Sequence, residues 1–174
     1  MGLIPRGLLW NCHSREACPR EAREREWGAE SWKKILDEAA ALGCLVVRLT
    51  GGEPLLRDDF EEIYIHARRL GLRVMIFTNA TLVTPRLARL LKDMPPLEAV
   101  EVSVYGMKKD TYEAVTRAPG SFEAFRRGLG LLRENGVPFI VKGAILPATR
   151  GEMGERRKPG GAGETGRPGL EFVH

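Results

Sequence analysis

The stretch Leu49–Pro54, with the sequence LTGGEP, holds the groups best suited to bind a small ligand. It follows the apolar run Cys44–Val47, so it stands where a buried strand ends and a loop begins. Open parallel α/β folds bind their ligands at such strand ends. Gly51 and Gly52 let the backbone approach a ligand closely, and the Glu53 carboxylate can accept hydrogen bonds from an ammonium group. The motif predicts an amino-acid-like ligand, with a tight Gly-Gly turn and a solvated glutamate as the alternative.

The three cysteines are the second group of candidates. Their odd number, in a chain without an export signal, argues against a disulfide framework and leaves metal binding or burial. Cys12 and Cys18 have five residues between them, and His13 stands beside Cys12. Cys44 opens an apolar run, so we expect it to be a small core residue, as free cysteines usually are.

The chain from Ala29 to Ile145 alternates helical and strand-like segments with short junctions, which is typical of βα units. Asp58 with Glu61 predicts a capping box for the second main helix, and Thr84 before a proline predicts a capped start for the third. Apolar residues at helical spacing predict helices over 32–42, 60–70, 84–91 and 121–135, and apolar runs predict strands over 44–47, 74–77, 100–104 and 139–145.

Strands that are each reached through a helix lie parallel, because parallel pairing requires crossover connections. The predicted fold class is therefore α/β, an open parallel sheet or part of a barrel with ligands at the carboxyl ends of its strands. We expect three regions: an irregular N-terminal arm over 1–28, the α/β domain over 29–147, and a Gly/Pro-rich tail over 148–174. Within this tail we expect a flexible segment from Arg150 to Gly169, followed by a short strand at Leu170–Val173.

Composition excludes several classes of protein. The formal net charge is +4, and the arginines are scattered along predicted helices, so the concentrated basic stripe of a nucleic-acid-binding protein is missing. No apolar stretch approaches the roughly 20 residues that span a bilayer. We expect a folded cytoplasmic protein that binds neither nucleic acid nor membrane.

Three further motifs extend the LTGGEP segment into a family pattern. Phe77–Thr81 (FTNAT) is similar to a "TNGT" strand end, with Ala80 where glycine is more usual. Val102–Gly106 (VSVYG) and Pro119–Phe122 (PGSF) follow in order. Together these motifs resemble the radical S-adenosylmethionine (SAM) enzymes, and among them the SPASM-type maturases that modify peptides and proteins. The resemblance covers roughly 32–147.

The resemblance implies a partial parallel (βα) barrel of the radical SAM type, with four to five βα units in place of six. It also implies SAM as cofactor, with Gly51, Gly52 and Glu53 holding the amino and carboxylate ends of its methionine. Ser103 and Asn79 would contact the methionine carboxylate or the ribose. The alternative for Ser103 and Asn79 is that they satisfy backbone groups at strand ends.

The resemblance further implies a [4Fe–4S] cluster, held by three cysteines spaced CxxxCxxC; thiolates are soft ligands suited to iron–sulfur clusters. In the corresponding region this chain has only Cys12 and Cys18, so the motif is incomplete. We therefore expect no stable cluster, and we expect the chain to be a truncated or frame-shifted part of a longer protein.

The resemblance implies a peptide or protein substrate. One alternative is a degenerate module that binds SAM, a peptide or a partner chain without catalysis. A second is another branch of the superfamily that acts on a nucleotide or small molecule in cofactor synthesis. A phosphate-binding α/β protein is weakly supported, because the chain lacks a glycine loop with the P-loop lysine. An incomplete barrel has open sheet edges, which predict self-association.

Overall fold

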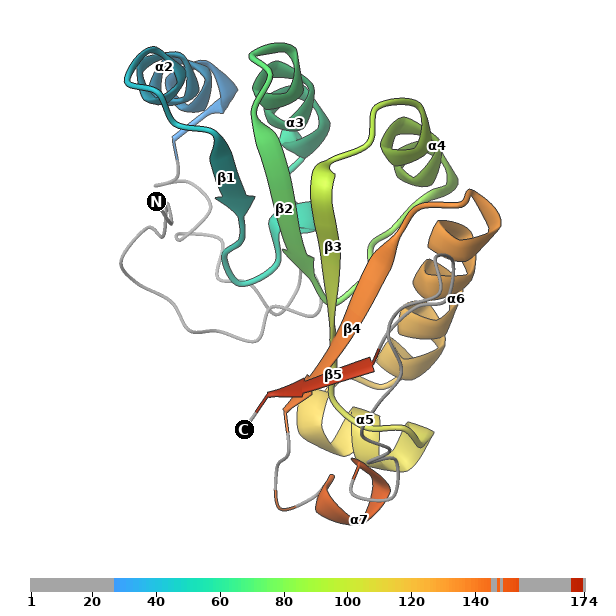
Figure 1. The fold of residues 1–174 in the computed structure, drawn as a ribbon. Helices are drawn as coiled ribbons and strands as arrows, with labels where there is room; N and C mark the ends of the chain where they lie inside the picture. The colour runs from blue at the N-terminus through green and yellow to red at the C-terminus, as the bar shows by residue number, and fades with distance from the viewer. Residues whose placement is uncertain (1–26, 145–146, 148, 154–169, 174) are drawn as a thin grey trace, which may run out of the picture.

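The computed structural model describes residues 27–144, 147, 149–153 and 170–173. Helices and strands alternate along this part of the chain (Figure 1). In chain order the elements are α2 (Ala29–Ala41), β1 (Val46–Leu49), the 3-10 helix η1 (Pro54–Leu56), α3 (Phe60–Arg69), β2 (Arg73–Thr78), α4 (Pro85–Asp93), β3 (Leu97–Val104), α5 (Lys109–Thr116), α6 (Ser121–Glu134), β4 (Phe139–Ala144), α7 (Arg150–Met153) and β5 (Leu170–Val173).

The described strands form one sheet in the order β1-β2-β3-β4-β5. Each neighbouring pair is parallel, so strands adjacent in sequence are also adjacent in space. Helices α2, α3, α4 and α6 follow one another along one side of this sheet (Figure 1). The predicted α/β fold, a parallel sheet assembled from βα units, is confirmed, and the short strand expected near the C-terminus is β5.

The hydrophobic core lies between the sheet and these helices. Val100, Val102 and Val104 of β3 are at most 3% exposed and belong to this core. The side chains between them, including Glu101 and Ser103, therefore belong to the opposite face of the sheet. Burying one such apolar side chain contributes roughly 1.5–3 kcal/mol, so the helix-facing side holds the sheet together.

The first strand begins later than predicted. The sequence predicts a strand from Cys44, whereas β1 starts at Val46. The backbone N–H of Cys44 donates to the carbonyl of Ala39 at 2.9 Å, and the N–H of Gly43 donates to Ala40 at 3.0 Å. This pair of bonds closes the C-terminus of α2, so Cys44 still belongs to the helix end. Its side chain is half-buried against the core, as expected.

The two predicted helix starts have different outcomes. Thr84 is the N-cap of α4, and its hydroxyl accepts a hydrogen bond from the N–H of Leu87 at 3.1 Å, which confirms that prediction. The predicted N-cap at Asp58 is wrong by one residue: helix α3 begins at Phe60 with Asp59 as its N-cap, and the Asp59 side chain makes no capping hydrogen bond. The Asp59 carboxylate instead pairs with Arg57 at 2.8 Å.

The expectation of a flexible segment from Arg150 does not hold for Arg150–Met153, which forms α7. The Glu152 carboxylate accepts hydrogen bonds from the backbone N–H groups of Met107 at 2.9 Å and Lys108 at 3.2 Å. It also accepts one from the Thr111 hydroxyl, and this bond lowers the pKa of Glu152. Glu152, 41 residues beyond Thr111, thus links α7 to the residues at the start of α5.

Among the described residues, no helix combines the length and the apolar character needed to cross a membrane.

Candidate functional site

The predicted site residues lie at the carboxyl ends of three neighbouring strands. Gly51, Gly52 and Glu53 follow β1, Asn79 follows β2, and Ser103 is the second-last residue of β3. Because β1, β2 and β3 are parallel and adjacent, their carboxyl ends share one edge of the sheet. The tertiary structure thus brings these residues to a common edge, as the strand pattern predicts.

Glu53 is turned into the protein rather than toward solvent, since it is only 5% exposed. Its Oε1 accepts hydrogen bonds from the Thr78 hydroxyl at 2.7 Å and from the backbone N–H of Leu55 at 3.1 Å. Its Oε2 accepts one from the backbone N–H of Asn79 at 2.7 Å. The solvated glutamate of the alternative interpretation is therefore wrong, and the carboxylate ties the loop after β1 to the end of β2.

Burial dominates the electrostatics of Glu53. Loss of solvation raises the pKa of this carboxyl from 4.5 to about 7, although the bonds from Asn79, Thr78 and Leu55 each favour the charged form. A carboxyl with a pKa near neutrality changes its charge in the physiological range. An ammonium ion bound beside it would favour the charged form further.

Asn79 shapes the loop after β2. Its Oδ1 accepts hydrogen bonds from the backbone N–H of Thr81 at 2.9 Å and from the Thr81 hydroxyl at 2.6 Å. Between them, Ala80 has a φ of 60°, a left-handed conformation that glycine adopts more readily. This geometry explains why glycine is usual at that position of the motif. The Asn79 side chain thus satisfies a backbone N–H group at the strand end, which was the alternative interpretation of this residue. Its contact with a ligand stays a prediction.

Ser103 lies one strand further along the edge and hydrogen-bonds the Tyr105 side chain. Burial, and then the charge of Glu53, raise the pKa of Tyr105, so Tyr105 and Glu53 lie close enough to interact electrostatically.

Tyr112 of α5 is 0% exposed, and its hydroxyl has no hydrogen-bond partner in the described part of the chain. Gly106 permits this packing, because a Cβ there would stand 2.8 Å from the Tyr112 nitrogen.

The glycine pair leaves open space in front of the backbone. Both Gly51 and Gly52 are exposed, and a Cβ added at Gly51 would meet no atom within 4 Å. Gly51 has no positive φ either, so neither strain nor a described neighbour requires glycine there. A contact of the Gly51 backbone with a ligand therefore stays a prediction.

The cysteines do not form a metal centre within the described residues. Cys12 and Cys18 lie outside that part of the chain. Cys44 precedes β1 at the amino end of the sheet, and its thiol donates to the carbonyl of Val46 at 3.3 Å. No group of three or more His, Cys, Asp or Glu side chains among the described residues could hold a metal ion. The described residues therefore provide no ligand set for a cluster.

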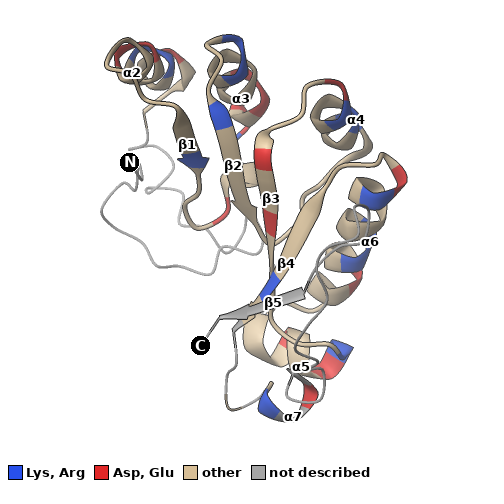
Figure 2. Cartoon of the chain, in the orientation of Figure 1, with Lys and Arg blue, Asp and Glu red and all other residues tan. Residues whose placement is uncertain are grey.

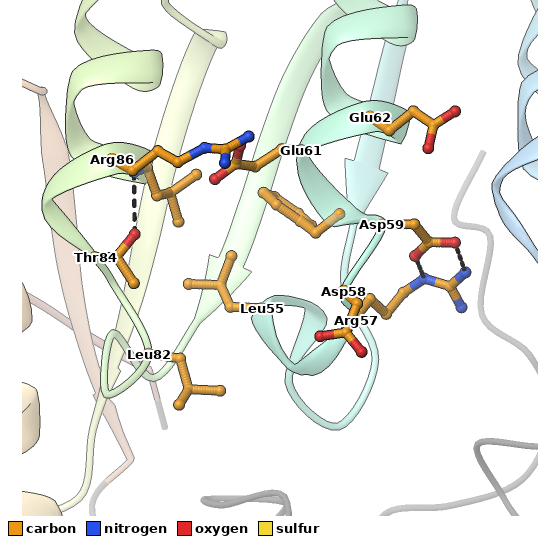
Figure 3. Close-up of a pocket in the computed structure, with 11 residues that line it drawn as sticks. Leu55, Arg57, Asp58, Asp59, Glu61, Glu62, Leu82, Thr84 and Arg86 are labelled. Carbon is orange, nitrogen blue, oxygen red and sulfur yellow. Dashed lines mark hydrogen bonds and ion pairs between the residues drawn. The ribbon is translucent and has the colours of Figure 1, made fainter.

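A hollow of about 400 Å³ lies elsewhere, between η1 with the start of α3 and the start of α4 (Figure 3). None of the predicted site residues lines it. Two of its carboxylates are already paired: Asp59 with Arg57, and Glu61 with Arg86 at 2.9 Å. We therefore place the candidate site at the strand ends and not in this hollow.

Charged residues gather on the helices, and the strands carry few of them (Figure 2). One exception is the pair formed by Glu101 of β3 and Lys142 of β4, whose Oε2 and Nζ atoms are 3.0 Å apart. Lys142 is the register partner of Ser103. The pair thus lies on the face of the sheet opposite the core valines of β3, below the strand ends.

Comparison with known proteins agrees with this geometry. The model of the radical SAM superfamily matches residues 11–155. The AdoMet-dependent heme synthase of Methanosarcina barkeri is 32% identical over 81% of this chain and 43% of its own length. The Fe-coproporphyrin III synthase of the same organism is 36% identical over 70% of this chain and 30% of its own length. The PqqA peptide cyclase of Methylocella silvestris is 28% identical over 90% of this chain and 44% of its own length.

The chain thus spans less than half the length of these three relatives. The family match covers strands β1 to β4 and every predicted site residue, including Cys12 and Cys18. On this match, and with the glycine pair, Glu53 and Asn79 assembled at the carboxyl ends of parallel strands, the chain belongs to the radical SAM superfamily.

Proposed function

We propose that this chain is the part of a radical SAM enzyme that binds the methionine end of SAM. The observation that carries the proposal is the Glu53 carboxylate, buried at the strand ends and held by Thr78 and Asn79 behind an exposed glycine pair. Glu53 and the backbone of Gly51 and Gly52 would hold the amino group.

The carboxylate end of the methionine, or the ribose, would meet the neighbouring strand ends. Asn79 and Ser103 are the residues proposed for that contact, by family resemblance and by their place at the same edge. When bound, SAM supplies the carbon radical with which this superfamily abstracts hydrogen atoms. The protein's own contribution at this edge is binding and orientation of the cofactor.

Glu53→Gln tests this proposal, because it keeps the side-chain shape and removes the charge. A hydrogen bond to a charged group is worth roughly 1.5–3 kcal/mol, so the variant is expected to bind SAM roughly tenfold to a hundredfold more weakly. Equilibrium dialysis with labelled SAM measures this at a pH above 7, where Glu53 is ionised.

Glu38→Gln, at an exposed position of α2, is the matched control and should bind SAM like the wild-type chain. Binding that is indifferent to Glu53→Gln would remove the site assignment. Absence of binding to the wild-type chain would contradict the proposed function itself.

Members of this superfamily use SAM together with a [4Fe–4S] cluster. Cys12 and Cys18 are the proposed cluster ligands of this chain, and two thiolates are fewer than the three that the motif needs. We therefore infer that this chain does not assemble a stable cluster by itself. A non-catalytic module that binds SAM, a peptide or a partner chain is the alternative.

For the substrate we propose a peptide, as in the SPASM-type maturases. The PqqA peptide cyclases of Methylocella silvestris and Ruegeria pomeroyi, at 28% identity each, support this class. Peptide backbones pair readily with open sheet edges, and β1 has no strand on its outer side in the described sheet. The same edge supports the predicted self-association, which stays a prediction.

A tetrapyrrole substrate is the second candidate, favoured by the similarity to the heme and Fe-coproporphyrin III synthases of Methanosarcina barkeri. Titration of the chain with Fe-coproporphyrin III, followed by the absorbance of the tetrapyrrole, separates the two classes. The peptide proposal predicts no saturable change in that absorbance. A saturable change would replace it with the second candidate.

A further inference from the structure

Thr78 joins the two loops that make up the candidate site. It is the last residue of β2 and is 3% exposed. Its hydroxyl donates to Oε1 of Glu53 at 2.7 Å and accepts a hydrogen bond from the backbone N–H of Ala80 at 3.0 Å. One side chain therefore fixes both the carboxylate that follows β1 and the left-handed turn that follows β2.

The two oxygens of Glu53 are not equivalent. A carboxylate oxygen accepts about two hydrogen bonds. Oε1 already has two donors, the Thr78 hydroxyl and the Leu55 N–H, whereas Oε2 has only the Asn79 N–H among the described residues. The acceptor position that remains is on Oε2.

We propose that Thr78 is a positioning residue of this site: its hydroxyl saturates Oε1 of Glu53 and leaves Oε2 as the oxygen that a ligand ammonium group meets. The assignment rests on the proposed SAM site for the identity of that ligand. The Thr78–Glu53 contact itself can be tested without SAM. Nothing in the sequence motif assigns a role to this threonine, because its partner is 25 residues away.

The titration of Glu53 can be used to measure the effect of Thr78, because the ionisable groups near Glu53 do not titrate in the same pH range. The ionisable groups that sense its charge are Tyr105, next to β3, and Tyr112 of α5. Burial first, and the charge of Glu53 among the lesser causes, raise the pKa of both phenols, so both stay neutral while Glu53 titrates. The bond from Thr78 favours the charged carboxylate and lowers the pKa of Glu53.

The experiment compares Thr78→Val, which removes the hydroxyl at nearly constant shape, with Thr78→Ser, which keeps it. In the full chain, selective 13C labelling of the glutamate δ carbons reports the titration of Glu53, whose resonance is the one missing in Glu53→Gln. Thr78→Val should shift the titration midpoint upward and weaken SAM binding at neutral pH roughly tenfold. Thr78→Ser should restore both.

Thr116→Val is the matched control. It removes another buried hydroxyl, which pairs with Ser121 at 2.8 Å on α5 and α6, and should lower stability without moving the Glu53 midpoint. A Thr78→Val protein that is less stable but has an unchanged midpoint would overturn the proposal. A midpoint that rises in Thr78→Val and returns in Thr78→Ser supports the positioning of Glu53 even if the wild-type chain binds no SAM. That last result would count against the proposed function alone.

Discussion

Replacing Gly128 with alanine is expected to lower the free energy of unfolding by about 3 kcal/mol, because the added methyl group has no room. A Cβ at Gly128 would stand 2.0 Å from the carbonyl oxygen of Ala80 and 3.0 Å from its carbonyl carbon. Helix α6 therefore packs directly on the turn that carries Asn79. Ala80 cannot easily move away from the added methyl group, because the hydrogen bonds between Asn79 and Thr81 hold it in a left-handed conformation.

Gly130→Ala, two residues further along the same helix, is the matched control. Its nearest neighbour would be Oε1 of Glu134 at 3.9 Å, the mobile end of a side chain. Because alanine favours the helix interior over glycine, this variant should gain about 0.5–1 kcal/mol. Urea unfolding of both variants measures the difference. Equal effects of the two substitutions would contradict the close packing of α6 on the turn.

The wild-type protein is expected to lose about 3 kcal/mol of stability, relative to Glu53→Gln, as the pH rises from about 4.5 to about 7. The pKa of Glu53 is raised in the folded state from 4.5 to about 7, mainly by burial. Between these values the folded state binds the proton more tightly than the unfolded state. The stabilisation is therefore fully present below pH 4.5 and is lost as the pH rises through the folded pKa.

Urea unfolding at several pH values from about 4 to about 8 checks this slope, taken as the difference between wild type and Glu53→Gln. The glutamine variant lacks the titrating group and cancels the contributions of all other groups. Glu38→Gln, at an exposed position, should follow the wild-type curve. If the free energy of unfolding of the wild type, relative to that of Glu53→Gln, rose with pH, the prediction would be wrong. The three hydrogen bonds to Glu53 would then outweigh its desolvation.

Local patterns predicted much of the fold. Thr84 capped α4 as expected, because an N-cap bond joins residues three apart and depends only on nearby sequence. The predicted N-cap at Asp58 was wrong by one residue, since α3 begins at Phe60 with Asp59 as its N-cap, and the Asp59 carboxylate pairs with Arg57. Helix ends are decided by differences of about 1 kcal/mol, which a neighbouring side chain can reverse.

The amino-acid sequence by itself determined the α/β class, the parallel sheet and the edge at which Gly51, Gly52, Glu53, Asn79 and Ser103 lie. These follow from hydrophobic periodicity and from the rule that parallel strands need crossovers, both of which are local properties.

Only the tertiary structure decided that Glu53 is buried and bonded to Thr78 and Asn79, 25 and 26 residues away. It likewise decided that Glu152 contacts the start of α5 and that Gly128 contacts Ala80. The physical reason is that hydrogen bonds and close packing act over about 3–4 Å. Residues distant in sequence come within that range only when the whole sheet and its helices have assembled.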